Sequence, residues 1–117
     1  MENLLISTLN NQIQVTDLYR EEEVAKFQGH LNSNFLLDSH FLEINEDIYL
    51  LSGSEDHAFY VWEVNEYSNI LNNNNCNFFK KELPVKNVNC LTSNCDGLIC
   101  VSGFPDNNSI FLMKFEK

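Results

Sequence analysis

The sequence predicts an all-β chain built from repeated antiparallel sheets, and three observations support this fold class. A pattern of apolar run, short polar turn and second apolar run occurs at residues 3–18, 48–64 and 97–115. Each first run ends in a serine, Ser7, Ser52 or Ser102, so successive copies are 45 and 50 residues apart. Shorter strand candidates between the hairpins bring the total to roughly four strands per period. A regular period of this size is typical of a repeat architecture.

Four shorter segments supply the remaining strand candidates. In chain order they are "EEVAKFQ", "FLLDSHFLE", "NFFKKELPV" and "KNVNCLTS". In the first, Val24 and Lys26 alternate with Ala25 and Phe27, which is the pattern of a half-buried strand. A helix over Arg20–Phe27 is the alternative, because this segment is rich in helix formers. A Gly-His pair follows at once and leaves no room for a second helical turn, so we expect a strand.

Length and charge narrow the class of protein. The 117 residues are enough for one domain, and a hydrophobic content of 44% permits a packed core. The net charge of −10 argues against direct binding of nucleic acid, which needs clustered Lys and Arg, and against an anionic membrane surface. Such a charge favours solubility and suits basic partners.

Localisation and cysteine usage agree with an intracellular protein. The N-terminus has no secretory signal pattern, and no apolar run approaches the roughly 20 residues that span a bilayer. We therefore expect the protein in the nucleus, the cytoplasm or both.

The four cysteines, Cys76, Cys90, Cys95 and Cys100, form no C-x-x-C pair and have no histidine downstream. We expect no metal or other cofactor, and we interpret Cys90 and Cys100 as small apolar strand residues.

One segment carries a family signature. Gly29-His30 is followed some thirty residues later by Trp62-Glu63, and Ser52-Gly53-Ser54 and Asp56 lie between them. This pattern resembles the WD40 repeat. The resemblance implies a partial β-propeller made of four-stranded antiparallel blades. It extends over essentially the whole chain, but only the second repeat carries the full signature.

The resemblance also implies a division into blades. Residues 1–29 would be an incomplete blade without its inner strand. Residues 30–84 would be a complete blade that contains an asparagine-rich insert at 69–77. Residues 85–117 would be the final blade without its outer strand. We expect the end segments Leu4–Leu9 and Ile110–Phe115 to expose apolar surface. The other blades would be missing from this sequence, supplied by another chain, or built from further copies.

In WD40 blades a tryptophan belongs to a hydrogen-bonded set of four residues. By resemblance this structural tetrad is His30, Ser52, Asp56 and Trp62, with Ser54 as the alternative serine. The buried indole needs an acceptor, and Ser52 is expected across the hairpin from Trp62. The resemblance also implies that His30 bonds both Ser52 and Asp56. A catalytic role for the Ser, His and Asp is disfavoured, because no nucleophile elbow is present.

The first and third repeats depart from this pattern. In the first, Asn10 occupies the position of the turn Asp and Thr16 that of the Trp. In the third, Asp106 is kept but Met113 replaces the Trp. We expect these blades to depend on apolar packing.

The resemblance implies a non-catalytic scaffold that binds other proteins of a multi-subunit complex through its loops. The candidate partner-binding residues are Leu31, Asn34, Phe35, Asp38 and His57. Two subfamilies share features of Phe27–Phe41, namely the spliceosome-associated MAP-kinase organiser and the WD-repeat subunit of histone methyltransferase complexes. The second carries an aromatic residue at the position of Asp38, where it stacks on an arginine of its ligand. Asp38 therefore favours the organiser.

Overall fold

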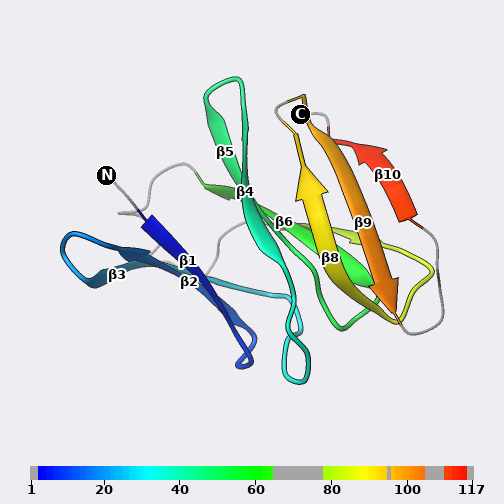
Figure 1. Ribbon diagram of the computed structural model, residues 1–117, viewed down its shortest axis with the longest axis horizontal. Coiled ribbons are helices and arrows are strands. Elements are labelled where there is room, and N and C mark those ends of the chain that lie inside the picture. The colour runs from blue at the N-terminus through cyan, green and yellow to red at the C-terminus, as the bar shows by residue number, and fades with distance from the viewer. Residues whose placement is uncertain (1–2, 65–77, 95, 105–109, 116–117) are drawn as a thin grey trace.

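The computed structural model describes residues 3–64, 78–94, 96–104 and 110–115, and these residues form strands, turns and loops (Figure 1). In chain order the strands are β1 (Asn3–Thr8), β2 (Gln12–Asp17), β3 (Glu22–Gln28), β4 (Ser39–Ile44), β5 (Asp47–Ser52), β6 (Ala58–Val64), β7 (Phe78–Glu82), β8 (Asn87–Ser93), β9 (Leu98–Phe104) and β10 (Ile110–Lys114). The predicted all-β class is confirmed. The helix considered for Arg20–Phe27 is wrong, because this segment forms β3 and pairs with β2.

Three antiparallel sheets account for all the described strands. The first has the order β1-β2-β3, the second β4-β5-β6-β7 and the third β10-β9-β8. Figure 1 shows the second sheet between the other two. Sheets of three and four strands are consistent with partial WD40 blades, and the described residues form no closed ring. The asparagine-rich insert and Asp106 lie outside the described residues.

The core consists of two apolar clusters, one on each face of the second sheet. Strand β6 contributes to both clusters, because its successive side chains point to opposite faces. Trp62 and Tyr60 belong to the first cluster, which the first sheet completes, and Phe59 and Val61 belong to the second, which the third sheet completes. Burial on both faces explains why the sequence of β6, "AFYVWEV", is almost continuously apolar.

The second and third sheets also meet through their backbones. The Ser54 N–H donates to the Val88 carbonyl at 2.9 Å, and the Val88 N–H donates to the Ser54 carbonyl at 2.8 Å. Gly53 makes this approach possible, because a Cβ atom there would overlap the Val88 carbonyl oxygen.

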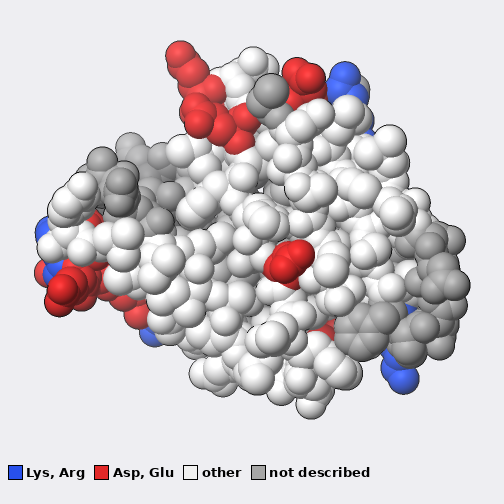
Figure 2. Space-filling view, in the orientation of Figure 1, with Lys and Arg blue, Asp and Glu red and all other residues white. Residues whose placement is uncertain are grey.

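The outer faces of the first and third sheets expose apolar side chains, as predicted for the end segments. Leu4, Ile6, Ile110 and Leu112 belong to those segments, and Leu98 of β9 lies outside them. Figure 2 shows acidic groups at the tip of the β4–β5 hairpin and around the β2–β3 hairpin, while the middle of this face carries one acidic group surrounded by uncharged residues.

Candidate interaction site and the buried cluster beneath it

Trp62 lies at the centre of the contact between the first and second sheets. Its side chain has no solvent exposure, and its indole N–H donates to the backbone carbonyl of Gln28 at 3.1 Å. The rings of Phe27 and Tyr60 lie beside it, with centroids 5.9 and 5.8 Å away. Trp62 therefore joins β6 to the last residue of β3.

The predicted position of Ser52 opposite Trp62 is wrong. In the observed register Leu50 pairs with Trp62, and Ser52 pairs with Tyr60, so the pairing is offset by two residues. The Ser52 hydroxyl donates to the Gly53 carbonyl at 2.8 Å instead. Residue spacing along the chain does not fix the register, which depends on where the hairpin closes.

The serines used to align the repeats are not equivalent either. Ser52 lies on the same face of its sheet as Leu50, which belongs to the cluster shared with the first sheet. Ser102 lies on the outer face of the third sheet, where it lines a hollow with Cys100. Met113 packs against the second cluster from the third sheet.

His30 packs against Trp62 through its ring. The two rings meet edge to face with centroids 5.4 Å apart, and only 3% of the histidine is exposed. Neither ring nitrogen has a hydrogen-bond partner within the described part of the chain, so the predicted bonds to Ser52 and Asp56 are not formed. Burial lowers the pKa of His30 to about 4, although the charges of Asp56 and Glu55 oppose the shift. His30 is therefore neutral at physiological pH.

Asp56 is held by strand residues rather than by the histidine. The Tyr60 hydroxyl donates to its carboxylate at 2.6 Å, and the Lys80 ammonium lies 3.5 Å from the same oxygen. Burial by itself would raise the pKa of Asp56. The hydroxyls of Ser54 and Tyr60 and the charge of Lys80 outweigh burial, so the pKa is lowered. Asp56 thus ties the β5–β6 turn to β6 and β7.

Ser54, the alternative serine, holds the segment that follows the Gly-His pair. It is fully buried, accepts the Leu31 N–H at 2.9 Å and lies 3.3 Å from the Leu31 carbonyl. The backbone N–H of Glu55 also donates to the Leu31 carbonyl, at 2.8 Å.

Glu55 was not predicted as a site residue, yet it anchors the loop before β4. Its carboxylate accepts the backbone N–H groups of Ser33, Asn34 and Phe35 at 3.1, 2.9 and 2.9 Å. The Asn34 side-chain amide donates to it at 3.1 Å. Burial would raise the pKa of Glu55, but these donors outweigh burial and lower it. The residue type could not reveal this role, because an acid in a hairpin turn is usually solvated.

The anchored loop exposes large apolar side chains. Leu31 and Phe35 are each 41% exposed, and Leu36 is 88% exposed. Leu9, in the β1–β2 turn, is also exposed. Two hydrogen bonds hold this turn beside the anchored loop: the Asn11 N–H donates to the Asn32 carbonyl at 3.0 Å, and the Asn32 N–H donates to the Asn11 side-chain oxygen at 2.7 Å. Figure 1 shows both loops at the same end of the molecule. We call Leu9, Leu31, Phe35 and Leu36 the apolar loop patch.

The structure brings together only some of the predicted partner-binding residues. Leu31, Asn34 and Phe35 share the anchored loop. Asp38 is exposed, but its backbone is bonded to Asn89 and Gly53. The ring of His57 lies with Nδ1 2.9 Å from the Val85 carbonyl. Asp38 is therefore bonded to β8 of the third sheet, and His57 is bonded to the loop between β7 and β8.

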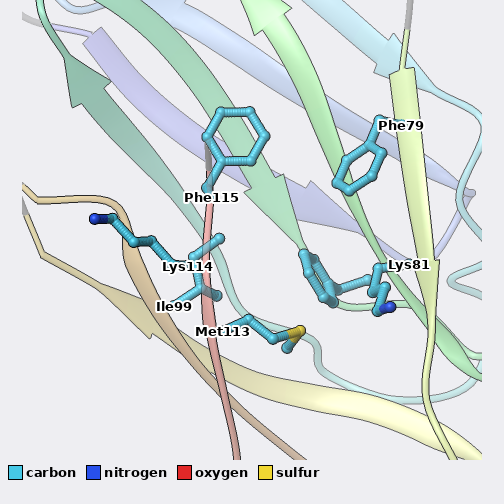
Figure 3. Close-up of a pocket in the computed structure, with 7 residues that line it drawn as sticks. Phe79, Lys81, Ile99, Met113, Lys114 and Phe115 are labelled. Atoms are coloured by element: carbon cyan, nitrogen blue, oxygen red, sulfur yellow. The ribbon is translucent and has the colours of Figure 1, made fainter. Parts of the chain in front are cut away.

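A separate groove lies between the second and third sheets. It has a volume of about 320 Å³, and its apolar walls are Phe59, Phe79, Ile99, Met113 and Phe115. Figure 3 shows Lys81 beside this apolar group, while the Lys114 side chain extends away from it. None of the described residues that line the groove is acidic. Among the described residues, no cluster of three or more His, Cys, Asp or Glu could hold a metal ion, and no helix could cross a membrane.

The packed antiparallel sheets of three and four strands are consistent with partial blades of a WD40 repeat protein. Comparison with known proteins points the same way. The chain is 36% identical over 58 residues to a WD repeat-containing protein of Dictyostelium discoideum, a match that covers 50% of this chain and 10% of that protein. It is 30% identical over 97 residues to the WD repeat-containing protein 26 homolog of Drosophila melanogaster, covering 77% of this chain and 13% of that protein.

A third match is to the 2-deoxy-glucose resistant protein 2 of Saccharomyces cerevisiae, at 27% identity over 65 residues, or 56% of this chain and 8% of that protein. No family model matches the chain. The matched part of the chain spans only about a tenth of the length of each of these relatives. None of the three carries the name of a MAP-kinase organiser or of a methyltransferase subunit, so neither predicted subfamily gains support.

Proposed function

We propose that this chain is part of a non-catalytic WD40 scaffold that binds other proteins through the apolar loop patch. The observation that carries the proposal is the Glu55 anchor. Five donors converge on one carboxylate, three of them backbone N–H groups of consecutive residues. A loop already held in one conformation loses little entropy when it binds.

The exposed side chains of this loop fit such a role. Exposed apolar groups that cluster on an ordered loop mark contact surfaces more often than scattered ones do. Beneath the patch, His30, Ser54, Asp56 and Trp62 would act as structural support that ties loop, turn and sheet together. His57 and Asp38 would contribute only to a partner that also reaches the β7–β8 loop and β8.

Two kinds of multi-subunit complex are candidates for the assembly that contains this scaffold. The resemblance of Phe27–Phe41 favours a spliceosome-associated or MAP-kinase scaffold, in the nucleus or the cytoplasm. The alternative is a WD-repeat subunit of a histone methyltransferase complex that binds arginine-containing peptides. Asp38 speaks against this alternative, because a carboxylate offers no aromatic face for an arginine. Neither candidate requires direct contact with nucleic acid or membrane.

Affinity capture with matched variants tests the proposal. The tagged chain and a Phe35→Ser/Leu36→Ser variant would be recovered from the cells that produce the protein, and bound proteins would be quantified by mass spectrometry. Leu18→Ser is the control, because Leu18 is similarly exposed, at 45%, in the β2–β3 turn. We expect the double variant alone to lose its partners. Equal recovery by all three chains would refute the role of the patch, and the identity of the partners separates splicing from methyltransferase complexes.

A further inference from the structure

Two cysteines lie together on the outer face of the third sheet. Cys90 of β8 and Cys100 of β9 are both free thiols, the first exposed and the second half-buried. Both line one hollow of about 280 Å³, which also includes Thr92, Ser102 and Asp38. The sequence had suggested only small apolar strand residues at these positions. Because they share a hollow, the two thiols could bind one ligand together, which the proposed protein-binding role does not require.

The strand register indicates how far apart the backbones of the two cysteines lie. The register shifts between Val88 and Cys90; beyond the shift Cys90 pairs with Ser102, and Thr92 pairs with Cys100, so the cysteines are diagonal neighbours on one face. Diagonal residues of antiparallel strands have Cα atoms roughly 7–8 Å apart, with the Cβ atoms somewhat closer. A disulfide needs Cα atoms within about 6.8 Å and Cβ atoms within about 4.5 Å. A disulfide would therefore require the backbone to move.

Two sulfur atoms bound to one metal ion lie farther apart than two sulfur atoms in a disulfide bond. Metal–thiolate bonds of roughly 2.3 Å on each side place two sulfurs about 4.6 Å apart. Rotation about χ1 can turn both thiols toward each other across the diagonal. Structural zinc takes four ligands, and the described residues offer no group of three or more suitable side chains. Soft thiolates in a site with few ligands suit copper(I) instead.

We propose that Cys90 and Cys100 form a two-thiolate site for copper(I). Binding releases one proton from each thiol to solvent and forms two copper–sulfur bonds, without transfer of electrons. Asp38 is a hard oxygen ligand and is not expected to complete the coordination. The site rests on the register and the shared hollow, and it does not depend on the proposed scaffold function.

Competition for copper(I) tests the site in the full chain. The reduced protein would be titrated without oxygen against bicinchoninate, whose copper(I) complex is coloured. We expect the wild-type chain to withdraw one equivalent. Loss of an outer-shell group already weakens metal binding by about 10–100-fold. Cys90→Ser and Cys100→Ser should therefore each weaken binding at least about tenfold.

The matched control is Cys76→Ser/Cys95→Ser, which leaves the two proposed ligands and should bind as the wild type does. Far-UV circular dichroism would confirm that every variant is folded. Loss of binding in this control, or equal binding by the wild type, Cys90→Ser and Cys100→Ser, would overturn the proposal.

A thiol-bridging reagent gives an independent measurement. Phenylarsine oxide condenses with two nearby thiols and releases one water. Cleavage before Asp96 would separate the two cysteines, so a bridge keeps two peptides joined in the mass spectrum. We expect a bridge from Cys90 to Cys100 in the Cys76→Ser/Cys95→Ser variant. Two unlinked peptides would contradict the required proximity.

Discussion

The indole N–H of Trp62 donates to the backbone carbonyl of Gln28 at 3.1 Å, which joins the second sheet to the outer strand of the first. The bond lies within the apolar cluster that these two sheets share. It gives the buried indole the acceptor that it needs. It also fixes the point from which the chain leaves β3 toward the anchored loop.

Trp62→Ala should lower the free energy of unfolding by about 3–5 kcal/mol, because it opens a cavity between two sheets. Trp62→Phe should cost less, since the ring keeps part of the packing and loses only the N–H donor. Urea denaturation followed by circular dichroism measures both. A loss below about 1 kcal/mol for Trp62→Ala would show that this residue does not join the sheets.

Glu55→Gln should lower the free energy of unfolding by about 1–2 kcal/mol, because hydrogen bonds to a partly exposed charged acceptor become bonds to a neutral amide. Glu43→Gln is the matched control, since Glu43 is an exposed residue of β4. Denaturation of the two variants side by side makes the comparison. Equal stability of both would remove the evidence for an anchor.

Gly53→Ala should destabilise the chain by about 1–3 kcal/mol, because the added methyl group forces the second and third sheets apart at Val88. Thr92→Ala, on the exposed outer face of β8, should be nearly neutral. Thermal melts of both variants would measure the difference. If Gly53→Ala melts with the wild type, the close approach does not exist in solution.

Acid should destabilise the protein in two steps. The pKa of His30 falls from its ordinary value of 6.5 to about 4 on folding, so its contribution is full above pH 6.5 and is lost as pH falls toward 4. Glu55 and Asp56 also have lowered pKa values, so their contributions are lost at still lower pH. Denaturation across this range should show a decline between pH 6.5 and 4 that His30→Phe removes. A decline of the same size in that variant would assign it to other groups.

The sequence predicted the strands better than the contacts between them. Alternating and continuous apolar runs revealed β3 and β6, because burial on one or two faces leaves a direct pattern. The acceptor of Trp62 could not be found in this way, because it is the backbone carbonyl of Gln28 and carries no residue signal. The importance of Glu55 depends on where a distant loop folds back, which local pattern does not encode.

Hydrogen exchange at Ser33, Asn34 and Phe35 shows whether Glu55 holds the loop in one conformation, since the backbone amides of these three residues donate to its carboxylate. NMR would follow these three amides in the wild type and in Glu55→Gln. We predict slow exchange in the wild type and markedly faster exchange in the variant, with the amides of β5 unchanged. Wild-type exchange as fast as in an unstructured peptide would contradict a loop held ready for a partner.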